Sequence, residues 1–233
     1  MNNLRNIEKD LKSLENKEKA LHHLRFFRTG MGEYGEGDKF LGITVPEQRK
    51  IAKKYPDINL NELQVLLRND YHEFRLTALI ILVDKYKKAK FDQDKQDLIN
   101  FYLKNTKHIN NWDLVDLSAE ILGQHYGESK PEIILKLSKS SDLWEQRISI
   151  IATYYLIKKN NFNLTLEIAL ILVNHKHDLI HKAVGWMLRE VGKRDLNTEL
   201  EFLDQNYKNM PRTMLRYAIE KFPEEPRLHY LKR

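Results

Sequence analysis

The chain has 233 residues, of which 42% are hydrophobic and 31% are charged, and this balance is typical of a soluble, folded protein. It has no cysteine, so disulfides, zinc ribbons and thiolate nucleophiles are excluded. Lysine and arginine outnumber aspartate and glutamate by 39 to 33, and the net charge of +6 permits a polyanionic partner such as nucleic acid without establishing one. The sequence has neither a run of about 18 apolar residues nor a signal-peptide core, so we expect a cytoplasmic protein with no membrane partner.

Apolar residues recur at spacings of three and four along almost the whole chain, and this periodicity predicts an all-α protein. Thr44 and Asn59 stand at the start of predicted helices, where their side chains can cap the first turn. A glycine-rich connection over residues 29–45, which includes Tyr34, follows the second helix. The predicted helices occupy residues 4–15, 17–28, 46–55, 60–67, 71–86, 92–105, 112–123, 130–138, 143–157, 161–173 or 163–173, 177–191, 197–207 and 211–222.

Short segments of similar pattern recur in the second helix of each predicted pair, roughly 31–41 residues apart. This period predicts an α-solenoid of HEAT-like helix pairs, a single domain over residues 1–233, whose second helices line a concave groove. The equivalent positions hold Arg75, Asp116, Arg147 and Lys182, which would then lie along that groove. The alternative is an irregular helical bundle, because the period is loose.

The predicted helix at 112–123 has the apolar content of a buried helix, yet it carries an acid beside a tryptophan. Trp112 and Asp116 are four residues apart, so they lie on the same face of a helix. Taken alone, this helix favours a plain role, in which Trp112 packs in the core and Asp113 or Asp116 caps the helix. A functional role is the alternative, because burying an aspartate without a partner is costly.

A second tryptophan helix carries two cations. Lys182, Trp186 and Arg189 share one face of the helix at 177–191. This set suits nucleic acid, because cations bind phosphates and indoles contact sugars or bases. Gly185, in the middle of the same helix, costs about 1 kcal/mol relative to alanine, so we expect another stretch of backbone to approach it closely.

Other aromatic and histidine residues favour structural roles. Trp144 stands at a helix start and is expected to fill the core, although Arg147 follows it by three residues. The histidine pairs at 22–23 and at 175 and 177 lack the partners and spacing of a metal site, so we expect surface or capping histidines.

Five motifs, none of them specific alone, form a specific combination that spans nearly the whole chain. They are Gly32-Glu-Tyr-Gly35-Glu-Gly-Asp-Lys-Phe-Leu-Gly42 with Val45-Pro46 and Arg49, Trp112-Asp-Leu-Val-Asp116, Arg147, Gly185-Trp186-Met-Leu-Arg189, and Met210-Pro-Arg-Thr-Met-Leu-Arg-Tyr-Ala-Ile. The combination resembles the DNA alkylation repair family, the AlkD-type DNA glycosylases built of HEAT-like repeats.

The resemblance implies an enzyme that excises cationic alkylated purines, chiefly 3-methyladenine and 7-methylguanine, from double-stranded DNA. It implies that Asp116 is the catalytic aspartate and that Trp112 and Trp186 are the tryptophans of the DNA groove. By the same resemblance, Arg147 is the groove arginine and Tyr34 is the tyrosine of the glycine-rich loop.

The chemistry of such a reaction fits these residue types. A purine alkylated at N3 or N7 is cationic and leaves without a general acid, so a carboxylate need only stabilise the oxocarbenium-like sugar and orient a water. Indoles can hold the cation by cation–π attraction, and Arg147, Lys182 and Arg189 would bind backbone phosphates. We expect no metal, no cofactor and a monomer. The alternative is a non-catalytic HEAT-like module that binds DNA or protein through the same groove.

Overall fold

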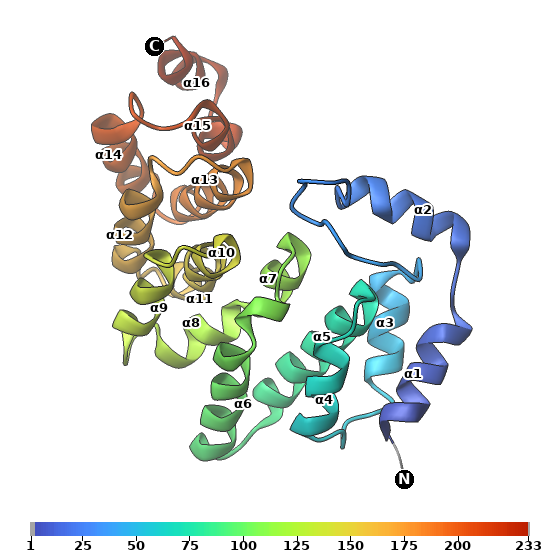
Figure 1. Ribbon diagram of the computed structural model, residues 1–233. Helices are drawn as coiled ribbons and strands as arrows, with labels where there is room; N and C mark the ends of the chain where they lie inside the picture. The colour runs from blue at the N-terminus through green and yellow to red at the C-terminus, as the bar shows by residue number, and fades with distance from the viewer. Residues whose placement is uncertain (1–2, 233) are drawn as a thin grey trace. The chain divides into compact units, whose positions relative to one another are not determined.

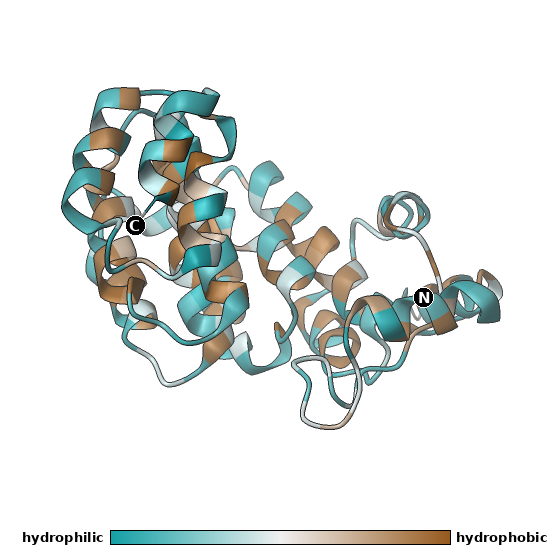
Figure 2. Ribbon diagram, turned by 90° about the horizontal axis from the view of Figure 1, so that it is seen from above, coloured by the Kyte–Doolittle hydropathy of each residue, from teal (hydrophilic) through white to brown (hydrophobic). Residues whose placement is uncertain are grey.

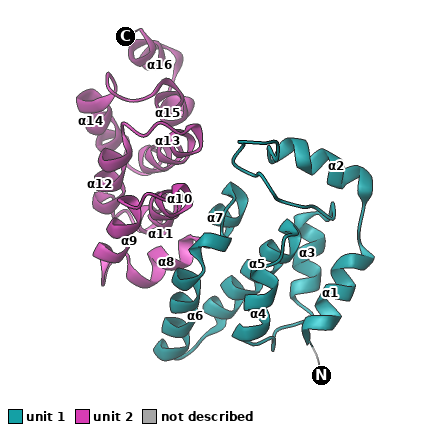
Figure 3. Ribbon diagram, in the orientation of Figure 1, with its two compact units in different colours: residues 1–118 teal, residues 119–233 magenta. Residues whose placement is uncertain are grey.

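The computed structural model describes residues 3–232, and the regular secondary structure in that range is helical (Figure 1). An isolated bridge joins Lys39 to Tyr71 at the glycine-rich connection. The chain divides into two compact units, residues 1–118 (unit 1) and residues 119–233 (unit 2) (Figure 3). The predicted all-α class is confirmed, while the single domain over residues 1–233 stays a prediction.

Unit 1 is built around α5 (His72–Lys88), which is buried along most of its length and packs against α3, α4, α6 and α7. Asn59 and Glu62 exchange hydrogen bonds in a capping box at the start of α4, and Glu47 accepts a bond from the backbone of Thr44 at the start of α3. The other elements are α1 (Asn3–Ser13), α2 (Lys17–Phe26), α3 (Val45–Ala52), α4 (Leu60–Leu67), α6 (Asp92–Lys104), the 3-10 helix η1 (Thr106–His108) and α7 (Trp112–Ser118).

Unit 2 is built around α13 (Asp178–Gly192), which packs against α10, α12, α14 and α15. A Cβ placed at Gly185 would overlap the backbone oxygen of Met214 and come within 2.6 Å of the Cβ of Tyr217, which confirms the expected close approach. The other elements are α8 (Glu120–Tyr126), α9 (Pro131–Ser138), α10 (Leu143–Ala152), α11 (Tyr154–Lys158), α12 (Asn163–Leu172), α14 (Leu196–Asn206), α15 (Arg212–Ala218), η2 (Ile219–Lys221) and α16 (Glu224–Leu231).

Most helices are amphipathic, and hydrophobic and hydrophilic residues alternate along them in Figure 2. Trp144 is 8% exposed, so its expected place in the core is confirmed. His177 caps α13, because its Nδ1 accepts a hydrogen bond from the backbone N–H of Leu179 at 3.1 Å. No helix within residues 3–232 has the length and the apolar content that a membrane crossing requires.

Two predicted helices are each divided into two α-helices in the structure. The helix predicted at 112–123 breaks at Ala119 into α7 and α8, and the one at 143–157 breaks at Thr153 into α10 and α11. At both breaks a hydroxyl bonds a carbonyl of the preceding turn: Ser118 donates to Leu114 at 2.6 Å, and Thr153 donates to Ile150 at 2.7 Å. Such bonds compete with the backbone amides of the helix and bend it.

Candidate functional site

Trp112 begins α7 and packs against an aromatic cluster from the end of α2. Its indole stacks on Phe27 with ring centres 5.4 Å apart, and Phe26 meets it edge-on at 5.8 Å. Phe27 stacks in turn on Phe40 at 5.0 Å. Phe27 and Phe40 are buried, whereas Phe26 is 55% exposed. Phe26 is therefore an exposed aromatic neighbour of the candidate site, and the paired phenylalanines at the end of α2 were the only sequence signal for it.

Asp116 lies one turn after Trp112 on α7, and both side chains are partly exposed. Burial raises the pKa of the Tyr102 phenol, a hydrogen bond with Ser118 opposes the rise, and the nearby charge of Asp116 adds to it. The Tyr102 hydroxyl lies 3.2 Å from that of Ser118, which fixes the end of α7 against α6. The helix thus presents a carboxylate and an indole on one partly open face.

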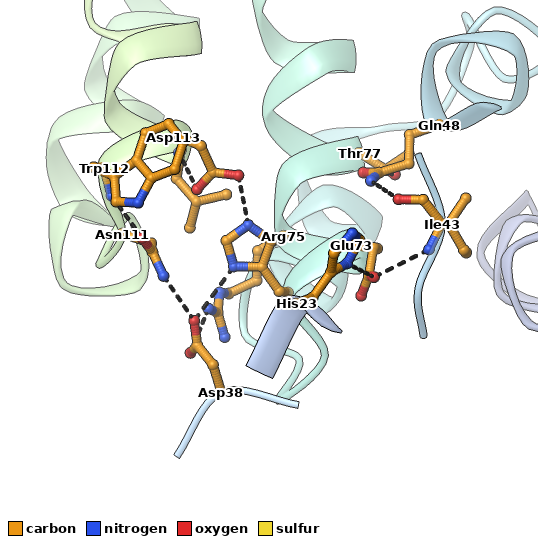
Figure 4. A network of polar contacts seen from close by, with 12 residues as sticks. His23, Asp38, Ile43, Gln48, Glu73, Arg75, Thr77, Asn111, Trp112 and Asp113 are labelled. Carbon is orange, nitrogen blue, oxygen red and sulfur yellow. Dashed lines mark hydrogen bonds and ion pairs between the residues drawn. The ribbon is translucent and has the colours of Figure 1, made fainter. Parts of the chain in front are cut away.

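Asp113, the other acid of α7, joins a buried polar network from three parts of unit 1 (Figure 4). Its carboxylate faces Nε2 of His72 at 2.8 Å and accepts the backbone N–H of Leu114 at 2.9 Å. The first-turn role expected for Asp113 is therefore only part of what it does. His72 comes from the start of α5 and is 2% exposed.

Asp38, from the glycine-rich connection, forms the other side of this network. It accepts hydrogen bonds from Arg75 at 2.7 Å and from the amide of Asn111 at 3.1 Å, and it lies 3.3 Å from Nδ1 of His72. The repeat pattern placed Arg75 in a groove, and this is wrong, because Arg75 is 5% exposed and paired with Asp38.

The pKa values of His72 and Asp38 are set by the opposite charges that face them. Burial alone would lower the pKa of His72, but the charge of Asp113 and hydrogen bonds to Asp113 and Asp38 raise it to about 9. Burial alone would raise the pKa of Asp38, yet its bonds to His72 and Arg75 hold it below the usual range. His72 is therefore cationic and Asp38 anionic at neutral pH.

Glu73 holds the glycine-rich connection next to this network. Its buried carboxylate accepts the backbone N–H groups of Leu41, Gly42 and Ile43 at 2.9, 2.8 and 3.3 Å. Gly42 has a φ of +79°, and a Cβ there would overlap the backbone at the start of α2, so only glycine fits. Tyr34 lies earlier in the same connection and is partly exposed.

In unit 2, Trp186 is partly exposed on α13. Its indole Nε1 donates to Glu190 at 3.1 Å, and its ring centre lies 6.1 Å from that of Tyr154. Sequence reasoning did not single out Glu190 or Tyr154, although Glu190 follows Trp186 by one helical turn.

The three predicted DNA-binding cations all have protein partners in unit 2. Arg147 is 4% exposed and donates from Nη1 to the carbonyl of Leu179, which ties α10 to α13. Lys182 pairs with Asp178 at 2.7 Å. Arg189 pairs with Glu220 and lies 3.7 Å from Glu190. Phosphate contacts by these residues stay predictions, and those of Lys182 and Arg189 would have to replace their ion pairs within the protein.

The candidate site residues thus form two local groups. Trp112 and Asp116 share a face of α7 in unit 1, while Lys182, Trp186 and Arg189 lie along α13 in unit 2.

A family described as DNA alkylation repair enzyme matches residues 7–222, which is most of the chain. The chain belongs to this family. Among curated proteins, none shows a significant match to this member of the family.

Two solved structures share the fold of this family member. A predicted DNA alkylation repair enzyme from Enterococcus faecalis superposes with a TM-score of 0.73 at 16% identity, covering 90% of this chain and 97% of that one. AlkD2 from Streptococcus mutans superposes with a TM-score of 0.56 at 20% identity, covering 95% and 97%. At these identities the likeness concerns the fold, and it confirms the predicted α-helical repeat architecture.

Proposed function

We propose that the chain is a DNA glycosylase that excises cationic alkylated purines, such as 3-methyladenine and 7-methylguanine, from double-stranded DNA. The observation that supports this best is the placement of Asp116 one turn from Trp112 on α7, with both side chains partly exposed and the indole backed by Phe27. Family membership supports the broader role in DNA alkylation repair.

In this reaction Asp116 stabilises the positive charge that develops on the sugar as the glycosidic bond breaks, and it orients the water that attacks the sugar carbon. The alkylated base is already cationic, so it departs as a neutral purine and needs no proton from the enzyme. Trp112 contacts the cationic nucleotide through its indole face. The neighbouring Phe26 ring adds a second aromatic surface to this contact.

The second group binds the DNA backbone. Lys182, Trp186 and Arg189 lie along α13. In the proposal the two cations contact phosphates, and Trp186 between them contacts a sugar or a base. Arg147 acts here mainly by holding α10 to α13. Tyr34 contacts the substrate from the glycine-rich connection.

The proposal is tested by releasing bases from methylated duplex DNA with the Asp116→Asn variant. The amide keeps the size of the side chain but removes its charge, so the rate of base release should fall about 100-fold or more. Free 3-methyladenine and 7-methylguanine are quantified by chromatography, and duplex binding is measured in parallel.

Asp94→Asn, at an exposed aspartate in the first turn of α6, is the matched control and should keep the full rate. Full activity of Asp116→Asn would remove Asp116 from the mechanism. If the unaltered protein binds duplex DNA in a salt-sensitive way but frees no base, it is a non-catalytic DNA-binding module instead.

A further inference from the structure

Both ring nitrogens of His72 face carboxylates. Nδ1 lies 3.3 Å from Asp38 and Nε2 lies 2.8 Å from Asp113. An ionised carboxylate only accepts hydrogen bonds, and a neutral imidazole has only one N–H to donate. Satisfying both contacts therefore requires the doubly protonated imidazolium.

The surroundings of His72 suit a cation. The Phe27 and Phe40 rings each lie 4.9 Å from the imidazole, and aromatic faces attract positive charge at this range. The charged groups that face the imidazole are Asp38 from the glycine-rich connection, Asp113 from α7 and Arg75 from α5 itself. Two acids and two cations make this buried network neutral, as a buried set of charges needs to be.

The polar network and the neighbouring Phe27 hold three successive residues, 111–113, at the start of α7. Asn111 donates to Asp38 at 3.1 Å and accepts the backbone N–H of Trp112 at 2.8 Å. The Trp112 indole lies on Phe27, and Asp113 is bound by His72. The start of α7 is therefore fixed at three adjoining points, and Asp116 follows one turn after Trp112 on the same helix.

We propose that His72, as an imidazolium held between Asp38 and Asp113, is the positioning residue that sets the first turn of α7 and thereby places Trp112 and Asp116 for catalysis. This inference rests on the proposed glycosylase function for its kinetic consequence. His72 itself is buried and does not touch the substrate.

Loss of the imidazolium proton should loosen α7. The pKa of His72 is raised from 6.5 to about 9, so its stabilising effect is complete below pH 6.5 and is lost as the pH rises through about 9. A neutral His72 ring keeps only one N–H, so either Asp38 or Asp113 would face a nitrogen lone pair instead of a donor. Base release by the unaltered protein should therefore fall above about pH 9, while duplex DNA is still bound.

The first test is His72→Gln, which can donate to one carboxylate but carries no charge. We expect the single-turnover rate of base release to fall about tenfold or more, because small displacements of catalytic groups are costly. Duplex affinity should stay within about threefold, and the fall in rate near pH 9 should disappear. His108→Gln makes the same chemical change on η1 and should keep both the rate and its pH profile.

Asp113→Asn keeps the contact with His72 but removes the charge that stabilises the imidazolium. The fall in rate should move to lower pH by about one unit or more, which loss of packing alone would not cause. The double variant, His72→Gln with Asp113→Asn, should be no slower than the worse single variant by more than about twofold, because both changes remove the same charge pair. Rate losses that multiply would show that the two residues act separately.

A measurement on the unaltered protein decides the matter if His72→Gln does not fold. Side-chain ¹⁵N NMR of histidine should show both nitrogens of His72 protonated at pH 7, with titration near pH 9. A neutral His72 at pH 7, or a folded His72→Gln protein with the original rate and pH profile, would overturn the proposal. If no base is released at all, the glycosylase proposal fails, and the positioning role in catalysis fails with it even where NMR finds the imidazolium.

Discussion

Glu199 is a buried acid in unit 2 that the proposed reaction does not use. It is 1% exposed, and its Oε1 has no hydrogen-bond partner. It borders a largely apolar cavity of about 360 Å³ with Leu196, Leu200 and Phe222 among the lining residues. Burial raises the pKa of Glu199 to about 8, although the charge of Arg189 acts in the opposite direction. The folded chain therefore carries this carboxyl protonated at neutral pH.

The raised pKa of Glu199 predicts a loss of stability with rising pH. The folded protein holds a proton that the unfolded chain releases above about pH 4.5, so its free energy of unfolding should fall between about pH 5 and 8, by about 1.4 kcal/mol per pH unit. Glu199→Gln should remove this slope and be relatively more stable at pH 8. Urea unfolding of both proteins across this pH range measures the free energy of unfolding. If it changes with pH equally in the two proteins, the raised pKa of Glu199 is contradicted.

Single residues of the site differ in how well the sequence predicts them. Trp112 and Asp116 are four residues apart, so helical periodicity alone places them on one face. His72 and Asp38 were missed, because His72 contacts partners that lie 34 and 41 residues away in the sequence. Local patterns give no sign of such contacts. A histidine in the first turn of a helix with an apolar run over residues 78–83 was the one available signal.

The contact between α13 and α15 depends on a missing side chain. At Gly185 the α15 backbone occupies the space that a Cβ would need. Gly185→Ala gains about 1 kcal/mol of helix propensity but forces the two helices apart, and we expect a net loss of about 1–3 kcal/mol in the free energy of unfolding. Gly30→Ala meets only the flexible side chain of Glu33 and is the control. An unchanged midpoint in urea for Gly185→Ala would contradict the contact.

Helix starts were easier to predict than helix interruptions. Thr44 and Asn59 mark their helices because a side chain three residues on completes the cap, and both partners are visible in the sequence. The breaks at Ala119 and Thr153 depend on which way a serine or threonine hydroxyl turns, and composition does not show that. The last helix, α16, was missed because only Tyr230 on it is buried, so it lacks a clear apolar stripe.

At the scale of the whole molecule, the charge balance fits a polyanionic partner. The net charge is +6, and the proposed phosphate contacts of Lys182 and Arg189 lie on one helix. The family and the helical repeat fold followed from motifs spread over the chain and from apolar periodicity. The contacts within each group of site residues did not, because they depend on packing between distant segments of one unit.

DNA binding by the whole chain should weaken steeply with salt, because phosphate contacts release condensed cations from DNA. Lys182→Gln should reduce the slope of log affinity against log salt by about one, since it removes one such contact. Lys54→Gln, at an exposed lysine paired with Asp10, should leave the slope unchanged. Fluorescence anisotropy of labelled duplex at several salt concentrations measures both slopes. Equal slopes for all three proteins would place Lys182 outside the DNA contact.

The run Asn111-Trp112-Asp113 has a consequence for how the chain tolerates insertions and deletions. Each of these residues meets a different partner, and each helical residue turns the chain by about 100°. Removing one of the two residues between Asp113 and Asp116 would turn the Asp116 carboxylate to another side of α7, away from the Trp112 indole. This would happen even if every remaining residue of the helix were unchanged. The number of residues between Asp113 and Asp116 must therefore be kept as strictly as the two acids themselves.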